Sequence, residues 1–118
     1  MRFEESTFLD ALREPRPDPG GGSVSEAIAC PYEMVVEVAD SFELILEIGR
    51  NCRSCLIPDL LVVLEIMRAS ARSGFHIAMA NVECVEDRRQ RRLLINELEL
   101  AVCEAEQNYS SVLRRLKV

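Results

Sequence analysis

The sequence is poor in aromatic residues and in positive charge. It contains no tryptophan, and aromatic residues make up 5% of its 118 positions. Since sequence-tolerant nucleic-acid binders stack bases on aromatic rings, such a platform is not expected, and the core must be aliphatic. The 14 Lys and Arg residues face 20 Asp and Glu residues, which leaves a net charge of −6. Because nucleic acids and anionic membranes attract a positive field, we expect neither as a partner.

A long apolar run and a basic leader are also missing. Glu65, Arg68 and Arg72 interrupt the most apolar region, which stays far short of the roughly 18 apolar residues that a membrane-spanning helix needs. Acidic residues at positions 4 and 5 stand where a secretory signal carries positive charge. We therefore expect a cytoplasmic protein. The odd number of cysteines, five, then indicates reduced thiols rather than a framework of disulfides.

Strand patterns and internal repeats are absent, and helical periodicity takes their place. Apolar residues recur every three or four positions, which is typical of helices that bury one face. The pattern predicts a short helix before Pro15 and three long helices, over about 32–48, from 58 to about 80, and from a capping Asp87 to the C-terminus. The expected fold is all-α, a single domain over 1–118 built as an antiparallel bundle of these helices. Because the apolar faces are broad for a monomer, we expect a homodimer.

The predicted middle helix is the most apolar part of the sequence. Between Leu60 and Ala80 nearly every face is apolar, which predicts a mostly buried helix. Before it, Gly49 and Asn51 lie where a left-handed residue would end the preceding helix. The middle helix carries one polar stripe, Glu65, Arg68, Arg72 and His76, and one ridge of small residues, Ser70, Gly74 and Ala78. Another helix could pack closely on that ridge.

A segment rich in proline and glycine, residues 16–23, is the only long break in the helical pattern. Consecutive glycines allow the backbone to approach a ligand and to turn several N–H groups toward one oxygen or anion. The segment is neither a G-x-x-x-x-G-K phosphate loop nor a G-x-G-x-x-G dinucleotide loop. Two interpretations are open, a flexible linker and a ligand-binding loop. The residues concerned are Pro19, Gly20, Gly21, Gly22 and Ser23.

The N-terminal part of the chain resembles the start of a known family of domains. Residues 8–12 read F-L-D-A-L, Pro15 follows, and residues 17–24 read P-D-P-G-G-G-S-V. This order resembles the N-terminal signature of formiminotransferase-cyclodeaminase C-terminal domains and methenyltetrahydrofolate cyclohydrolases.

A second, later match supports the same resemblance. Asp59 with the leucine after it, Asn81, and the acidic turn at 85–87 are similar to the family's second signature, although Ile77 stands where its first asparagine would be. The helices that would lie between the two halves, near 24–30, are missing. The chain therefore resembles a shortened member of the family.

The resemblance implies an all-helical dimer that acts on a tetrahydrofolate derivative, and we expect neither a metal nor a cofactor. Family members either close 5-formiminotetrahydrofolate with loss of ammonia or hydrate the methenyl bridge to 10-formyltetrahydrofolate. Both reactions pass through a tetrahedral carbon beside a delocalised cation, so they need a carboxylate that handles protons or favours positive charge, and amide-type donors that orient the pterin. The resemblance assigns these catalytic roles to Asp59 and Asn81, and substrate binding to residues 19–23. Taken without the resemblance, a residue such as Asp59 is more often a helix-start carboxylate, and one such as Asn81 is more often a helix C-cap.

Three other features have less specific meanings. Cys52-x-x-Cys55 has no regularly spaced second pair for a zinc site and no βαβ context for a redox motif, so packing cysteines are expected. His76, the only histidine, fits a neutral base beside Arg72 or a solvated structural residue. The arginines at 88, 89, 91 and 92 fit a contact for the glutamate tail of a folate or a solvated helix start.

The sequence thus supports two functional hypotheses. The first is a folate one-carbon enzyme or a relative of one, either a formimidoyltetrahydrofolate cyclodeaminase or a methenyltetrahydrofolate cyclohydrolase. The second is a non-catalytic helical homodimer, a shortened descendant or incomplete gene product of the same family that serves as an interaction module.

Overall fold

The computed structural model describes residues 21–117, and their side chains from residue 26 onward. The predicted short helix before Pro15, together with Pro19 and Gly20, lies outside the described residues. Within them the structure is all-helical and contains no strand, which confirms the predicted fold class and the three long helices. These are α2 (Gly21–Asn51), α3 (Ile57–Val82) and α4 (Arg88–Lys117), with a single 3-10 turn, η1 (Ser54–Leu56), between the first two.

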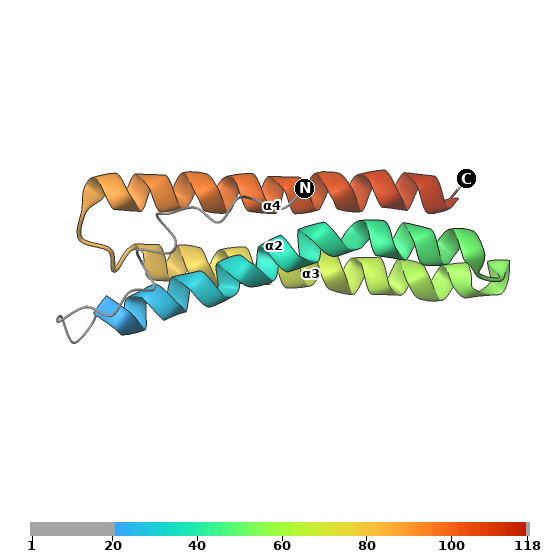
Figure 1. Ribbon diagram of the computed structural model, residues 1–118, viewed down its shortest axis with the longest axis horizontal. Coiled ribbons are helices and arrows are strands. Elements are labelled where there is room, and N and C mark those ends of the chain that lie inside the picture. The colour runs from blue at the N-terminus through green and yellow to red at the C-terminus, as the bar shows by residue number, and fades with distance from the viewer. Residues whose placement is uncertain (1–20, 118) are drawn as a thin grey trace.

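The three helices lie side by side along one long axis, and each contacts the other two (Figure 1). The molecule measures 55 × 20 × 19 Å. The start of α2, the end of α3 and the start of α4 lie together, and we call this the glycine end (Figure 1). The opposite end, where η1 joins α2 to α3 and α4 finishes, is called the connector end. No helix among the described residues is long and apolar enough to cross a membrane.

The core between the helices is aliphatic, as the composition predicts. Its largest fully buried side chains are Phe42, Ile28, Leu46, Leu64, Leu94 and Leu98. On α4 the predicted seam is confirmed, because every member is buried at steps of three, four or seven residues: Leu94, Leu98, Ala101, Ala105, Val112 and Leu116. Tyr109 occupies the same seam, and its ring meets Phe42 of α2 edge-on at 6.2 Å between centroids.

Both predicted helix starts are confirmed. Pro58 and Asp59 lie in the first turn of α3, where a proline loses no hydrogen bond and a carboxylate faces the positive end of the helix dipole. Asp87 caps α4, because its Oδ1 accepts the backbone N–H groups of Arg89 at 2.8 Å and Gln90 at 3.2 Å.

The prediction of a helix beginning near residue 32 is wrong, because α2 begins at Gly21 and passes through Pro31. Glycine is among the residues favoured at a helix start, so the glycines do not prevent a helix from beginning at Gly21. Tertiary contacts extend the helix: Ile28, Ala29 and Tyr32 are at most 6% exposed and belong to the core. Burial of these side chains therefore outweighs the local preference of the glycine and proline residues for a break. Residues 24–30, where the family resemblance places the missing helices, therefore lie inside one continuous helix.

The predicted left-handed helix end at Gly49 and Asn51 is also wrong. No described residue has a positive φ, and α2 continues through Asn51. Gly49 is instead a point of close approach, where an added Cβ would collide with the Cδ2 atom of Leu116 on α4. The neighbouring helix, and not the backbone angles, therefore favours a small residue here.

Gly74 marks a close approach between α2 and α3 and confirms the predicted ridge of small residues. A Cβ added to Gly74 would lie 2.8 Å from Met34 Cε, 3.0 Å from Val35 Cγ2 and 3.0 Å from the carbonyl oxygen of Pro31. Gly74 and Ala78 are buried, and Ser70 is half-buried. Small side chains thus allow the two helices to pack at close range.

The prediction that the middle helix is mostly buried is wrong for the single chain. On α3 only Leu64, Ala71, Gly74, Ala78 and Val82 are buried. Several large apolar side chains are exposed instead: Val62 by 58%, Ile66 by 60% and Ile77 by 52%. Among the described residues, α2 and α4 cover only one side of α3, and its opposite side is exposed.

Gly74→Ala tests the close approach between α2 and α3. Alanine would gain about 1 kcal/mol of helix propensity, but the Pro31 carbonyl is backbone and can move only with α2. We expect the free energy of unfolding, measured by urea denaturation, to fall by about 1 to 2 kcal/mol. Gly49→Ala is the matched control, because the tip of Leu116 can rotate away, and we expect a change within about 1 kcal/mol. An increase in stability for Gly74→Ala would contradict the described packing.

Candidate functional site

The glycine end brings together two of the predicted site elements. Gly21, Gly22 and Ser23 form the first turn of α2 rather than a loop, so the prediction of a loop is wrong for these three residues. Asn81 lies in the last turn of α3. Because its side chain contacts the carbonyl of Ala27, only six residues after Gly21, Asn81 and the glycines occupy the same end.

Asn81 compensates for the proline inside α2. Pro31 has no N–H, so the carbonyl of Ala27, four residues earlier, lacks its helical donor. The Nδ2 group of Asn81 donates to that carbonyl at 3.4 Å and to the carbonyl of Ile77 in its own helix at 2.9 Å. Both amide hydrogens of Asn81 are thereby used, and its Oδ1 is left to accept a hydrogen bond.

The interpretation of Asn81 as a helix C-cap is wrong, because Glu83 is the C-cap residue of α3. The described residues contain no positive φ, and α3 continues to Val82. The chain leaves the helix through a turn in which the N–H of Cys84 donates to the Asn81 carbonyl at 3.0 Å. The side chain of Asn81 is thus engaged across the helix pair, where it faces the start of α2.

Asp59 lies at the connector end, far from Asn81. It is exposed in the first turn of α3. The two residues are 22 positions apart on one uninterrupted helix, which separates them by roughly 33 Å. Groups that act on one carbon must both reach it within hydrogen-bond distance. One chain therefore does not bring its own Asp59 and Asn81 to one substrate.

The arginine cluster at the start of α4 divides into structural and free members. Arg91 is structural, because its Nε donates to the Val85 carbonyl at 3.1 Å and its Nη2 to the Glu86 carbonyl at 3.3 Å. Arg88, Arg89 and Arg92 are exposed and line a hollow of about 400 Å³ together with Leu93 and Asn96. This hollow lies at the glycine end, since α4 begins there (Figure 1).

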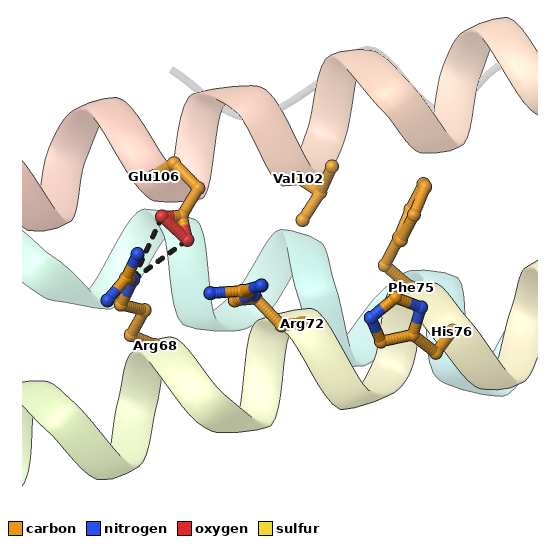
Figure 2. Close-up of a pocket in the computed structure, with 6 residues that line it drawn as sticks. All are labelled: Arg68, Arg72, Phe75, His76, Val102 and Glu106. Carbon is orange, nitrogen blue, oxygen red and sulfur yellow. Dashed lines mark hydrogen bonds and ion pairs between the residues drawn. The ribbon is translucent and has the colours of Figure 1, made fainter.

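A second hollow, of about 360 Å³, lies between the middle parts of α3 and α4. Arg68, Arg72, Phe75 and His76 line it from α3, and Val102 and Glu106 line it from α4 (Figure 2). Arg68 Nε donates to both carboxylate oxygens of Glu106, at 2.9 Å each. Phe75 and His76 meet edge-on at 5.6 Å between ring centroids.

A polar network joins α3 to α4 at this hollow, and it shares Arg68 and Glu106 with the hollow's lining. The guanidinium of Arg68 lies over the ring of Tyr109 at 4.9 Å from its centroid, and the Tyr109 hydroxyl donates to Oε2 of Glu65. The hydrogen bond to Glu65 and then burial raise the pKa of Tyr109 above 10.0. The ion pair with Glu106 raises the pKa of Arg68. Since these partners satisfy one another, the network holds the helices together.

Comparison with protein families decides the identity of the chain. The family model described as Formiminotransferase-cyclodeaminase matches residues 24–100, about two thirds of the sequence. The chain belongs to the formiminotransferase-cyclodeaminase family. Neither a curated protein nor a solved structure matches it.

In this member of the formiminotransferase-cyclodeaminase family, the match includes most of α2, all of α3 and the first half of α4. Asp59, Asn81 and the arginine cluster lie within it, whereas residues 19–23 precede it.

The expectation that Cys52 and Cys55 are packing cysteines is wrong for Cys55, which is exposed. Cys30, Cys55, Cys84 and Cys103 are exposed, and Cys52 is half-buried with its thiol 3.5 Å from the Gly49 carbonyl. All five are free thiols. In the part of the chain that the structure describes, no three His, Cys, Asp or Glu side chains gather in a way that could hold a metal ion.

Glu106 and Tyr109 are the site residues that sequence reasoning missed. Their partners Arg68 and Glu65 belong to the predicted polar stripe of α3. The contacting residues are, however, 38 positions apart in the sequence in one pair and 44 in the other. No local spacing indicates such a pair. The only available signal was a polar stripe on a helix expected to be buried, which implies a polar partner from another helix.

A double-mutant cycle tests the role of Asn81 at Pro31. In the wild-type background Asn81→Ala removes the donor to the Ala27 carbonyl, so we expect the free energy of unfolding to fall by about 1 kcal/mol. In a Pro31→Ala background the restored backbone N–H satisfies that carbonyl, and Asn81→Ala should cost measurably less. Equal losses in both backgrounds, measured by urea denaturation, would show that the two residues are not coupled.

The pH dependence of stability tests the Tyr109 contact. Because folding raises the Tyr109 pKa, its stabilisation is complete below pH 10 and is lost as pH rises through the higher folded pKa. At pH 8 we expect Tyr109→Phe to lower the free energy of unfolding by about 1 kcal/mol. The difference between wild type and variant should close above pH 10. A difference that stays constant from pH 8 to pH 11 would refute the hydrogen bond to Glu65.

Proposed function

We propose that the protein binds a reduced folate at its glycine end and catalyses a one-carbon reaction on it without a cofactor. The reaction is either the closure of 5-formiminotetrahydrofolate with loss of ammonia or the hydration of methenyltetrahydrofolate. The family match over residues 24–100 is the observation that carries this proposal. The active species is a cytoplasmic homodimer.

The polar groups of the glycine end suit the two parts of a folate. The free Oδ1 of Asn81 accepts a pterin N–H, which differs from the amide-donor role expected from the sequence because both Nδ2 hydrogens are used. Gly21, Gly22 and Ser23 present the unsatisfied N–H groups of a helix start beside it. Arg88, Arg89 and Arg92 supply charge for the carboxylates of the glutamate tail.

Asp59 provides the carboxylate that both reactions require. When the tetrahedral intermediate forms or breaks down, an oxygen or nitrogen atom bonded to its central carbon loses or gains a proton. A carboxylate within hydrogen-bond distance can accept or donate that proton. Asp59 is exposed in the first turn of α3 and is therefore accessible to a ligand. A substrate held at the glycine end of the same chain does not reach Asp59, because the length of α3 separates the two. The substrate must therefore approach Asp59 from outside its own chain's α3.

A non-catalytic homodimer is the second candidate function. The observation that favours it is the separation of Asp59 and Asn81 by the length of α3, which leaves one chain without a catalytic pair. In this case the exposed apolar side of α3 serves assembly alone. The two candidates differ in one measurable property, the effect of the protein on a methenyl-folate.

The loss of near-ultraviolet absorbance of methenyltetrahydrofolate tests catalysis. We expect added protein to accelerate it, and Asp59→Asn to reduce the acceleration by about 100-fold or more, the usual contribution of a positioned acid or base. A rate equal to that of buffer alone would eliminate the catalytic function and favour the second candidate.

Calorimetric binding of a polyglutamylated reduced folate tests the glycine end separately. Arg88→Gln combined with Arg92→Gln should weaken binding about tenfold, because two charge-assisted contacts to carboxylates are lost. Arg114→Gln, an exposed arginine at the opposite end of α4, is the matched control and should bind like wild type. Equal affinities for the two variants would place the ligand elsewhere.

A further inference from the structure

We propose that two copies of the chain pair through the exposed side of α3, antiparallel, so that Asp59 of one copy and Asn81 of the other form one composite site. The roles of these two residues rest on the proposed function, whereas the pairing itself rests on the surface of α3. The occupant of this surface is a second copy of the same chain.

The exposed side of α3 carries a stripe of large apolar and small side chains. With about 100° of rotation per residue, five exposed side chains fall on one side of the helix, opposite the buried Leu64, Ala71 and Ala78. We call this stripe the outer face of α3; it consists of Val62, Ile66, Ala69, Ser73 and Ile77. Its three large members are between 52% and 60% exposed, which is costly for a helix face that covers nothing.

The order of residues along the outer face is self-complementary. In an antiparallel pair centred between Ala69 and Ser70, Val62 lies opposite the partner's Ile77, and Ile66 lies opposite the partner's Ser73. Large residues therefore meet at both ends, and small residues meet at the centre, where the two helix axes can approach closely. A two-fold interface requires this kind of symmetry, in which each contact occurs twice.

Charges beside the outer face match in the same register. Glu65, Arg72 and His76 all lie along one border of the stripe, and like borders meet in an antiparallel pair. Glu65 then lies between the partner's Arg72 and the partner's His76. The Tyr109 hydroxyl donates a hydrogen bond to Oε2 of Glu65. The Oε1 atom of Glu65 then remains to accept a hydrogen bond from the partner's Arg72. A parallel pair would instead place both copies of Asp59 at one end.

This register supplies what the single chain lacks. Asp59 lies opposite the partner's Ala80, and thus one residue from the partner's Asn81. Since packed helix axes lie about 8–10 Å apart, a reduced folate held between them can reach both side chains. By symmetry the dimer holds two such sites, each formed by the glycine end of one chain and the connector end of the other.

The mass of the protein in solution tests the pairing without any ligand. Sedimentation should give twice the 13.3 kDa of one chain. Ile66→Asp should convert the protein to a folded monomer, because Ile66 is 60% exposed in the single chain. Leu100→Asp, a control at a 58% exposed leucine on α4, should remain a dimer. A monomeric wild type, or a dimer that Leu100→Asp dissociates and Ile66→Asp does not, overturns the proposal.

Cross-linking with a short bifunctional maleimide tests the register, in a background with all five cysteines replaced by serine and native circular dichroism. Ala69→Cys alone, next to the two-fold axis, should cross-link efficiently. Val62→Cys alone should not, because antiparallel pairing separates the two positions by roughly 22 Å. Val62→Cys combined with Ile77→Cys should cross-link. Efficient linkage by Val62→Cys alone would indicate a parallel pair and overturn the proposal.

Mixing two inactive variants tests the composite site. In a mixed dimer of Asp59→Asn and Asn81→Ala chains, one site combines both substitutions and the other combines the native Asp59 and Asn81. After subunit exchange, activity should recover to about a quarter of wild type, since half the dimers are mixed and each has one intact site. Recovery near zero with an active wild type overturns the composite site. An inactive wild type that still cross-links in the stated register overturns the proposed function and leaves the pairing intact.

Discussion

The straightness and continuity of α3 is the constraint on which the rest of the structure depends. Its 26 residues form one helix with a proline in the first turn and no interruption, so the helix fixes where Asp59 and Asn81 lie relative to each other. Its inner side holds α2 close at Gly74, and its outer side remains exposed. The packing of the molecule and the incompleteness of its site therefore have one cause.

Asn81 shows how a residue can be structural and functional at once. Its amide hydrogens repair the break that Pro31 makes in α2, and this repair fixes the orientation of the amide group. A fixed orientation is also what a binding residue needs, because less conformational freedom is lost when the ligand arrives. The proline and the asparagine thus act together at the glycine end, although they lie 50 residues apart.

Regular patterns made much of the fold predictable from the sequence. The seam of α4 follows from the spacing of Leu94, Leu98 and their successors, and Asp87 carries the signature of a helix cap. The start of α2 was not predictable, because glycine and Pro31 indicate a break locally while the burial of Ile28 is a tertiary effect. The network around Tyr109 depends on contacts between helices, for which the sequence contains no local signal. The separation of Asp59 and Asn81, in contrast, follows directly from the predicted middle helix.

The most direct test of the account is a titration of the isotope-labelled protein with a reduced folate, followed by the backbone amide signals in NMR spectra. We expect the signals of Asn81 and Arg92 at the glycine end to shift together with that of Asp59 at the connector end, and at the same folate concentration. The signals of Arg72 and Phe75, in the hollow between α3 and α4, should stay in place. Shifts confined to that hollow, or to only one end of α3, would contradict a folate site shared between two chains.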